Sequence, residues 1–257
     1  MKSFWTAFSM YSQIPVPSTQ WTADSMAWAL CCFPFIGIVS GFCLYLWLCF
    51  SFVFSLPPVL MGVISVLIPI LISGGIHLDG FCDTMDALAS NAPREKRLEI
   101  LKDTHAGAFS GIGCALYLIL LFAAWTQVPL YNNGAVIFSL TPVLSRSLSA
   151  FAAFTLPNAR GSGLLASFTE HTDLKKARIV MLLWILLTAA VMIIMNPRLG
   201  LLTFITACLT FLYYVRMSKK HFGGITGDLA GFFLQLCELT TVIVPVILQY
   251  VRLGGHI

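Results

Sequence analysis

Long apolar runs separated by short polar breaks dominate the chain. A bilayer core about 30 Å thick requires roughly 20 apolar residues per helix, and seven runs come near that length. They cover residues 30–55, 57–76, 107–128, 134–157, 178–195, 199–217 and 229–251. The tight breaks at 57–58, 129–134 and 196–197 contain prolines, which cannot continue a helix. The pattern predicts an all-α, polytopic integral membrane helix bundle of about seven transmembrane helices, with one domain over residues 1–257.

Composition supports a membrane protein. Of the 257 residues, 58% are hydrophobic and only 10% are charged, whereas soluble domains carry about 25% charge. Seven of the eight cysteines lie in apolar runs without C-x-x-C spacing, so we expect small buried side chains and not a metal site. We expect the protein to lie in a lipid bilayer and to have no nucleic-acid partner.

Charge is distributed unevenly along the chain. The N-terminus and the long polar connections at 77–106, 158–177 and 216–228 contain most of the 15 basic residues. These are Lys2, Arg94, Lys96, Arg97, Lys102, Arg160, Lys175, Lys176, Arg178, Arg216, Lys219 and Lys220. Because positive residues stay on the cytoplasmic side, we expect these segments to be cytoplasmic, in a multi-pass protein of the bacterial inner membrane. Most carboxylates follow them, so the active site is expected on the cytoplasmic face.

An acidic motif at residues 74–86 follows the second apolar run directly. Asp79, Asp83 and Asp86 have i, i+4, i+7 spacing and share one face of a helix. Their mutual repulsion requires a cation, and oxygen ligands favour Mg²⁺ or Mn²⁺ over zinc. The alternative is a solvated acidic patch where a helix leaves the membrane.

A glycine-rich motif at residues 221–228 precedes the last apolar run. Gly223 and Gly224 allow a tight turn that points backbone N–H groups, with Thr226, toward an anion. Asp228 is interpreted as a metal ligand or as the N-cap of the last helix. The sequence G-x-x-x-x-G-K-S/T does not occur, which excludes a P-loop nucleotide site.

Other charged residues lie in a segment at the membrane surface or inside the predicted spans. Residues 94–103 suit an amphipathic helix on the membrane surface, or a solvated connecting helix. Lys102 and Asp103, where the chain re-enters the membrane, are expected to face the acidic motif. Arg146 and Glu238 lie at similar depth in their spans, so they can pair, either as a structural ion pair or as part of the wall of a buried substrate cavity.

Acidic residues for a metal, basic residues on the same face and a glycine-rich turn together indicate transfer chemistry on a phosphate or pyrophosphate substrate. CDP-alcohol phosphotransferases need D-G-x-x-A-R, but Asp79-Gly80 is not followed by Ala-Arg. UbiA-type prenyltransferases have a second Asp-rich motif, which is absent here. An ion-coupled transporter is expected to carry charges along several helices and inverted repeats, whereas these acids lie at one interface.

Several stretches resemble the cobalamin synthase family, the adenosylcobinamide-GDP ribazoletransferases. Residues 74–86 match its G-G-x-H-L-D-G-x-x-D-T-x-D run, and residues 223–231 match G-G-x-T-G-D-x-x-G. Residues 98–104, 14–17, 33–37 and 159–163 resemble further family segments in the same order, and Arg146 resembles an in-span Arg. This chain departs from the family at His105, often Arg, at Ser162, often Leu, and at Gln235, often Glu.

The resemblance implies an enzyme that joins adenosylcobinamide-GDP to α-ribazole, or to its 5′-phosphate, with release of GMP. It assigns Mg²⁺ binding to Asp79, Asp83 and Asp86, and stabilisation of phosphoryl charge to Lys102 and Arg160 with the glycine turn. His77 or Asp103 is expected to accept the proton of the attacking 5′-hydroxyl. His77 can instead orient a carboxylate. A homo-oligomer, or association with other enzymes of cobalamin assembly, is compatible with this interpretation.

Overall fold

The structure is a computed structural model that describes residues 2–18, 20–103 and 105–254, so Thr104 of the matched segment 98–104 lies outside it. The described residues form helices and no strand. The helices are α1 (Lys2–Tyr11), α2 (Ala23–Met26), the 3₁₀ helix η1 (Leu30–Cys32), α3 (Phe33–Val53), α4 (Pro58–Ser73), α5 (Ile76–Ala89), α6 (Arg94–Ile100), α7 (Ala108–Trp125), α8 (Gly134–Ser139), α9 (Thr141–Thr155), α10 (Leu164–Glu170), α11 (Leu174–Met195), α12 (Pro197–Phe222) and α13 (Gly227–Gly254).

The predicted membrane bundle is confirmed. Within the described residues, six helical segments are long and apolar enough to cross a bilayer, and the bent pair α4–α5 brings the number to seven. Six predicted spans correspond to α3, α7, the α8–α9 pair, α11, α12 and α13. All-helical architecture is expected, because lipid offers no partners for the backbone polar groups of an open sheet.

The second span differs from its predicted form, which was one run over residues 57–76. Helix α4 ends at Ser73, and Gly74 and Gly75 take left-handed φ values of 64° and 79°. Such values favour glycine, which has no Cβ. Helix α5 then runs at 96° to α4. The predicted connection 77–106 therefore begins as a helix, and this helix carries the acidic motif.

Helices α9 and α13 form the interior of the bundle. Helix α13 packs against α5, α7, α9 and α12, and α9 also packs against α3 and α11. About 83% of the α8–α9 segment is buried, but only 28% of α11. Large apolar side chains remain exposed on the outer helices, including Ile119, Leu183 and Leu209. In a membrane this exposed apolar surface contacts lipid chains.

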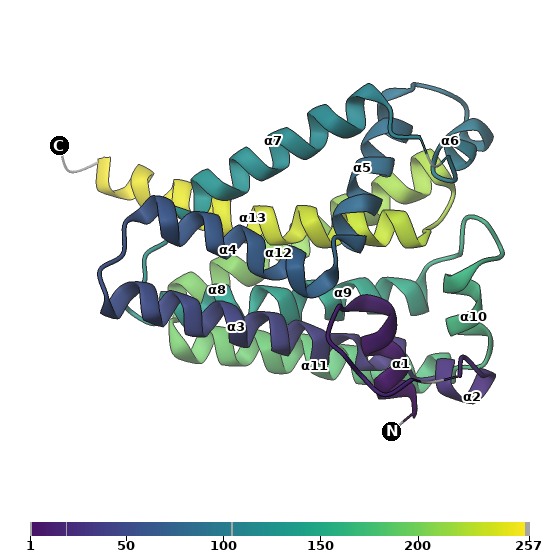
Figure 1. Ribbon diagram of the computed structural model, residues 1–257, viewed down its shortest axis with the longest axis horizontal. Coiled ribbons are helices and arrows are strands. Elements are labelled where there is room, and N and C mark those ends of the chain that lie inside the picture. The colour runs from purple at the N-terminus through teal and green to yellow at the C-terminus, as the bar shows by residue number, and fades with distance from the viewer. Residues whose placement is uncertain (1, 19, 104, 255–257) are drawn as a thin grey trace.

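The elements outside the spans lie together at one end of the bundle. Figure 1 shows α1, α2, α6 and α10 at the same end as α5, while the C-terminal end of α13 lies at the opposite end. The starts of α11 and α13 and the end of α12 meet at this end, so the basic residues expected on one face are indeed gathered there.

Candidate active site

The acidic helix α5 is held directly against the start of α13. A Cβ added at Gly80 would lie 2.8 Å from the carbonyl oxygen and 2.9 Å from the Cα of Asp228. A Cβ at Gly231 would lie 2.9 Å from the His77 carbonyl oxygen. Real Cβ atoms do not approach backbone so closely, so two glycines set the short separation of these helices. This packing brings Asp79 and Asp83 next to Asp228.

We expect Gly80→Ala to disturb this arrangement. Its methyl group must push the Asp228 backbone away, and a shift of about 1 Å at a reacting centre costs on the order of 10²-fold in rate. The measurement is kcat/KM of the purified protein. Gly111→Ala in α7 is the matched control, because a Cβ there meets nothing within 4 Å. Equal rates for the two variants would contradict the role of Gly80.

A short backbone pairing fixes Arg160 opposite Asp228. The Ile225 N–H donates to the Pro157 carbonyl at 2.9 Å, and the Ala159 N–H donates to the Ile225 carbonyl at 2.9 Å. Arg160 follows this pairing and forms an ion pair with Asp228, Nη2 to Oδ2, at 2.9 Å. The same Nη2 donates to the Leu101 carbonyl at 3.1 Å. Three segments distant in sequence therefore meet at Arg160.

The N–H groups at the beginning of the glycine-rich turn are not free to bind an anion. The N–H groups of Gly223, Gly224 and Ile225 already donate to the carbonyls of Lys219, Ser218 and Pro157. Gly223, with φ 73°, ends α12, and a Cβ at Gly224 would lie 2.3 Å from the Pro157 carbonyl oxygen. The turn instead serves chain reversal and close packing.

The N-cap interpretation of Asp228 is also wrong. The Leu229 N–H donates to Thr226 Oγ1 at 3.2 Å, so Thr226 caps α13. Asp228 lies in the first turn of the helix and is free to pair with Arg160. Within the described residues, the Gly227 and Asp228 N–H groups have no intramolecular acceptor. These free N–H groups and the helix dipole make the N-terminus of α13 attractive to an anion.

The three acids of α5 differ in their surroundings. Asp83 is half-buried and is repelled by Asp79, Asp228 and Asp86, while Arg160 attracts it. The helical face predicted for the three acids is confirmed. Asp86, however, accepts hydrogen bonds from the Gly107 N–H at 2.6 Å and the Ser110 N–H at 2.9 Å. Its carboxylate therefore fastens the start of α7.

The acids are compatible with a magnesium ion that would complete its coordination with substrate oxygens. Among the described residues, no three His, Cys, Asp or Glu side chains are already arranged to hold a metal. Mg²⁺ usually binds one or two carboxylates and completes its shell with water and substrate phosphates. Asp83 and Asp79, with Asp228 close by, supply that number of hard oxygen ligands.

Lys102 and Asp103 directly follow Leu101, whose carbonyl accepts a hydrogen bond from Arg160. Both are exposed. The Asp103 carboxylate accepts from the His105 N–H at 3.0 Å and pairs with the His105 ring at 2.9 Å. These two contacts lower the pKa of Asp103 below its ordinary value.

The surface helix predicted for residues 94–103 is shorter than expected. Helix α6 ends at Ile100, and Arg97, expected on a solvated face, is buried. The Arg97 guanidinium contacts the His221 ring, which attaches α6 to the end of α12. Arg97 therefore has a packing role at this end of the bundle.

A cavity of about 240 Å³ opens beside the ion pair. Its polar wall is defined here by Asp79, Asn158, Arg160, Ser162, Thr226 and Asp228. Its apolar wall is defined by Tyr11, Leu30, Phe33 and Leu165, with His77 beside the Tyr11 and Phe33 rings. His77 is only 6% exposed, and its Nε2 has no hydrogen-bond partner among the residues that the structure describes. Sequence analysis had identified His77 and the charged residues of the polar wall, but not the apolar side chains opposite them.

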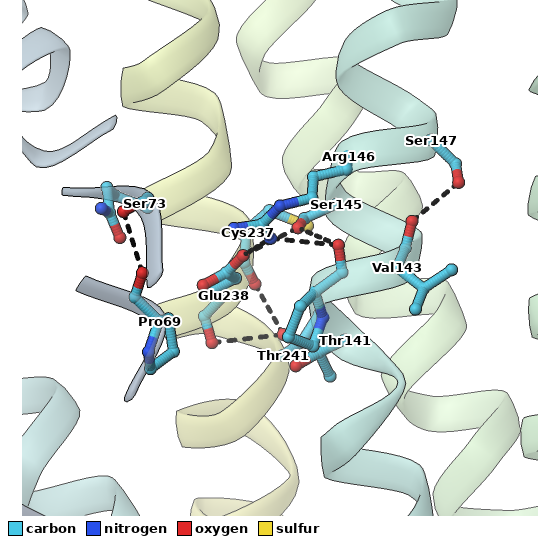
Figure 2. Close-up of polar contacts among 12 residues, drawn as sticks. Pro69, Ser73, Thr141, Val143, Ser145, Arg146, Ser147, Cys237, Glu238 and Thr241 are labelled. Carbon is cyan, nitrogen blue, oxygen red and sulfur yellow. Dashed lines mark hydrogen bonds and ion pairs between the residues drawn. The ribbon is translucent and has the colours of Figure 1, made fainter. Parts of the chain in front are cut away.

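Arg146 and Glu238 form the predicted ion pair behind the cavity wall, where the Arg146 guanidinium lies 5.8 Å from the centroid of the Phe33 ring. Arg146 Nη1 donates to Glu238 Oε1 at 2.7 Å, with side chains 1% and 10% exposed. Figure 2 shows Arg146 and Glu238 pointing toward each other, with Ser145 Oγ also donating to Glu238 at 2.9 Å. Neither residue lines the 240 Å³ cavity. The predicted ion pair is therefore confirmed, and the substrate-binding role of the two residues stays a prediction.

Comparison with known proteins gives the family. The profile of the cobalamin-5-phosphate synthase family matches residues 3–246. An adenosylcobinamide-GDP ribazoletransferase of Lachnoclostridium phytofermentans is 40% identical over 255 residues, covering 99% of this chain and 97% of the relative. An enzyme of that name from Clostridium perfringens strain SM101 is 33% identical, covering 95% and 98%. No solved structure matches the chain. The chain therefore belongs to the cobalamin-5-phosphate synthase family.

Proposed function

We propose that this membrane enzyme transfers the adenosylcobinamide phosphoryl group from adenosylcobinamide-GDP to α-ribazole or its 5′-phosphate, and releases GMP. A hydroxyl oxygen of the acceptor bonds to the phosphorus next to cobinamide, the bond from that phosphorus to the GMP oxygen breaks, and the hydroxyl proton leaves. The observation that carries the proposal is the Arg160–Asp228 pair. It lies beside Asp79 and Asp83 and opens on a cavity.

Charge on the pyrophosphate is balanced by groups from three segments. Asp79 and Asp83, with Asp228, would hold Mg²⁺, which when bound neutralises phosphate oxygens. Arg160 can turn its fork of N–H donors from Asp228 to a phosphate, because both are anionic oxygen acceptors. Lys102, which is exposed and follows the Leu101 that contacts Arg160, would add a positive charge. The start of α13 favours an anion through its helix dipole.

His77 is the better of the two candidate bases. A general base must lie within hydrogen-bond reach of the proton that it accepts. Asp103 is exposed, is not among the residues that line the cavity, and already accepts a hydrogen bond from the His105 N–H. His77 lines the cavity, and its Nε2 is buried without a partner. An acceptor hydroxyl would satisfy that nitrogen and give up its proton to it.

The expected 5′-hydroxyl nucleophile needs correction on chemical grounds. The family is described as making a cobalamin 5-phosphate. If the acceptor keeps a phosphate at its 5′ position, the 5′ oxygen is blocked. The attacking group is then a secondary hydroxyl of the ribose ring. That places the nucleophile closer to the base of the nucleoside.

The proposed site faces the cytoplasm from the bacterial inner membrane. The basic residues expected inside gather at the end that carries the site, and positive residues remain on the cytoplasmic side. Nucleotide substrates are charged and reach the enzyme from that compartment without crossing the bilayer.

Metal removal tests the function. With adenosylcobinamide-GDP and α-ribazole, we expect the purified protein to release GMP, and EDTA to reduce that release to background. Mg²⁺ should restore it, and Ca²⁺ should restore much less, because Ca²⁺ prefers more ligands at longer distances. GMP is quantified by chromatography. Absence of GMP from the untreated protein, or full release in EDTA, would overturn the proposal.

A further inference from the structure

We propose that the apolar wall of the 240 Å³ cavity binds the flat aromatic base of the acceptor nucleoside. Its wall residues are Tyr11, Leu30, Phe33 and Leu165, with His77 at the border to the polar wall. This inference rests on the proposed function and names which part of which substrate enters the cavity.

Aromatic rings surround His77 on this wall. The Tyr11 and His77 ring centroids are 6.2 Å apart and stacked, and the Phe33 and His77 centroids are 5.6 Å apart and edge-on. Leu30 and Phe33 are 5% and 3% exposed, so the wall is a fixed part of the core. A flat, apolar base gains contact area and ring stacking against such residues.

The unpartnered Nε2 of His77 indicates where the sugar lies. A buried polar nitrogen without a partner is unfavourable, and a ligand hydroxyl that bonds to it removes that cost. A base lying on Tyr11 and Phe33 places its ribose hydroxyls next to His77. The same cavity continues to Asp79, Arg160 and Asp228, where the phosphorus is expected.

The size and polarity of the cavity fit the acceptor nucleoside better than the corrin ring or the guanine of the donor. Pockets that enclose drug-sized ligands hold roughly 300–1,000 Å³, so a 240 Å³ cavity holds a nucleoside-sized group and not a corrin ring. Guanine has polar groups along its edges that need hydrogen-bond partners. The Leu30, Phe33 and Leu165 side chains offer none, and the polar side chains of Ser149, Asn158 and Ser162 line other parts of the cavity. A benzimidazole-type base has no such exocyclic groups.

Leu165→Trp tests the assignment. The half-buried Leu165 lies on α10 and lines the cavity, so a larger side chain there fills it. We expect KM for α-ribazole to rise at least 10-fold, while KM for adenosylcobinamide-GDP changes less than twofold. Leu183→Trp on the lipid-facing surface of α11 is the matched control and should change neither value. Thermal unfolding in detergent checks that both variants fold.

Calorimetric titration of α-ribazole in the absence of donor gives a second measurement that does not depend on turnover. Binding to wild type and at least 10-fold weaker binding to Leu165→Trp supports the assignment. Loss of donor affinity alone would show that the cavity holds guanosine, and unchanged values for both substrates would show that it holds neither. Both outcomes overturn the assignment. If wild type binds α-ribazole but releases no GMP, the proposed function fails and the binding assignment stands.

Discussion

Asp83→Ala is expected to reduce GMP release by on the order of 10²- to 10³-fold, the scale for removing one group that stabilises charge in a transition state. Asp83 lies among Asp79, Asp86 and Asp228 on the face of α5 that meets α13, and Arg160 attracts it. Without its carboxylate the site loses a ligand for Mg²⁺. We therefore also expect a higher Mg²⁺ concentration for half-maximal rate.

Glu95→Gln is the control for this variant. Glu95 lies on α6 at the same end of the bundle and is exposed. Its replacement removes one negative charge, as Asp83→Ala does, but leaves the site intact. Steady-state rates across a Mg²⁺ titration measure both effects. A full rate for Asp83→Ala, or an unchanged Mg²⁺ requirement, would refute the role of this carboxylate.

Glu238→Ala is expected to lower the free energy of unfolding by about 3–5 kcal/mol, because it leaves the Arg146 guanidinium buried without its counterion. Arg146 would keep one neutral contact, Nη1 to the Pro142 carbonyl at 3.1 Å. Replacing both members by methionine is expected to recover most of the loss, since no buried charge then remains. Thermal unfolding of the purified protein in detergent ranks the three proteins.

Glu170→Ala provides the control, because Glu170 is exposed at the end of α10, and such substitutions change stability by about 0.5 kcal/mol or less. The ion-pair interpretation also predicts that folded Glu238→Ala keeps its KM for both substrates. A normal melting temperature together with a raised KM would instead assign Glu238 to substrate binding.

The sequence was sufficient for features that depend on local periodicity and on depth in the membrane. Hydropathy located the spans to within a few residues, and i, i+4, i+7 spacing placed the three acids on one helical face. The Arg146–Glu238 pair followed from similar depth alone, because buried charges in a bilayer need partners.

Features that depend on contacts between distant segments were not accessible from the sequence. The Ile225 N–H is occupied because it pairs with the Pro157 carbonyl, a contact that no local pattern indicates. The burial of Arg97 depends on His221, 124 positions away. Tyr11 and Phe33 look like ordinary apolar positions until the fold places them around His77.

The short helix α4 determines how deep in the membrane the active site lies. Its 16 residues rise only about 24 Å, less than the roughly 30 Å of a hydrocarbon core. A helix of that length ends about 6 Å short of the far edge of the core, so α5 starts just beneath the lipid headgroups, whose phosphates compete for any exposed cation. The carboxylates around Arg160 repel those anions. Under the proposed function, a pyrophosphate that chelates a divalent ion would overcome this repulsion, and we expect the acids to exclude the phosphates of membrane lipids.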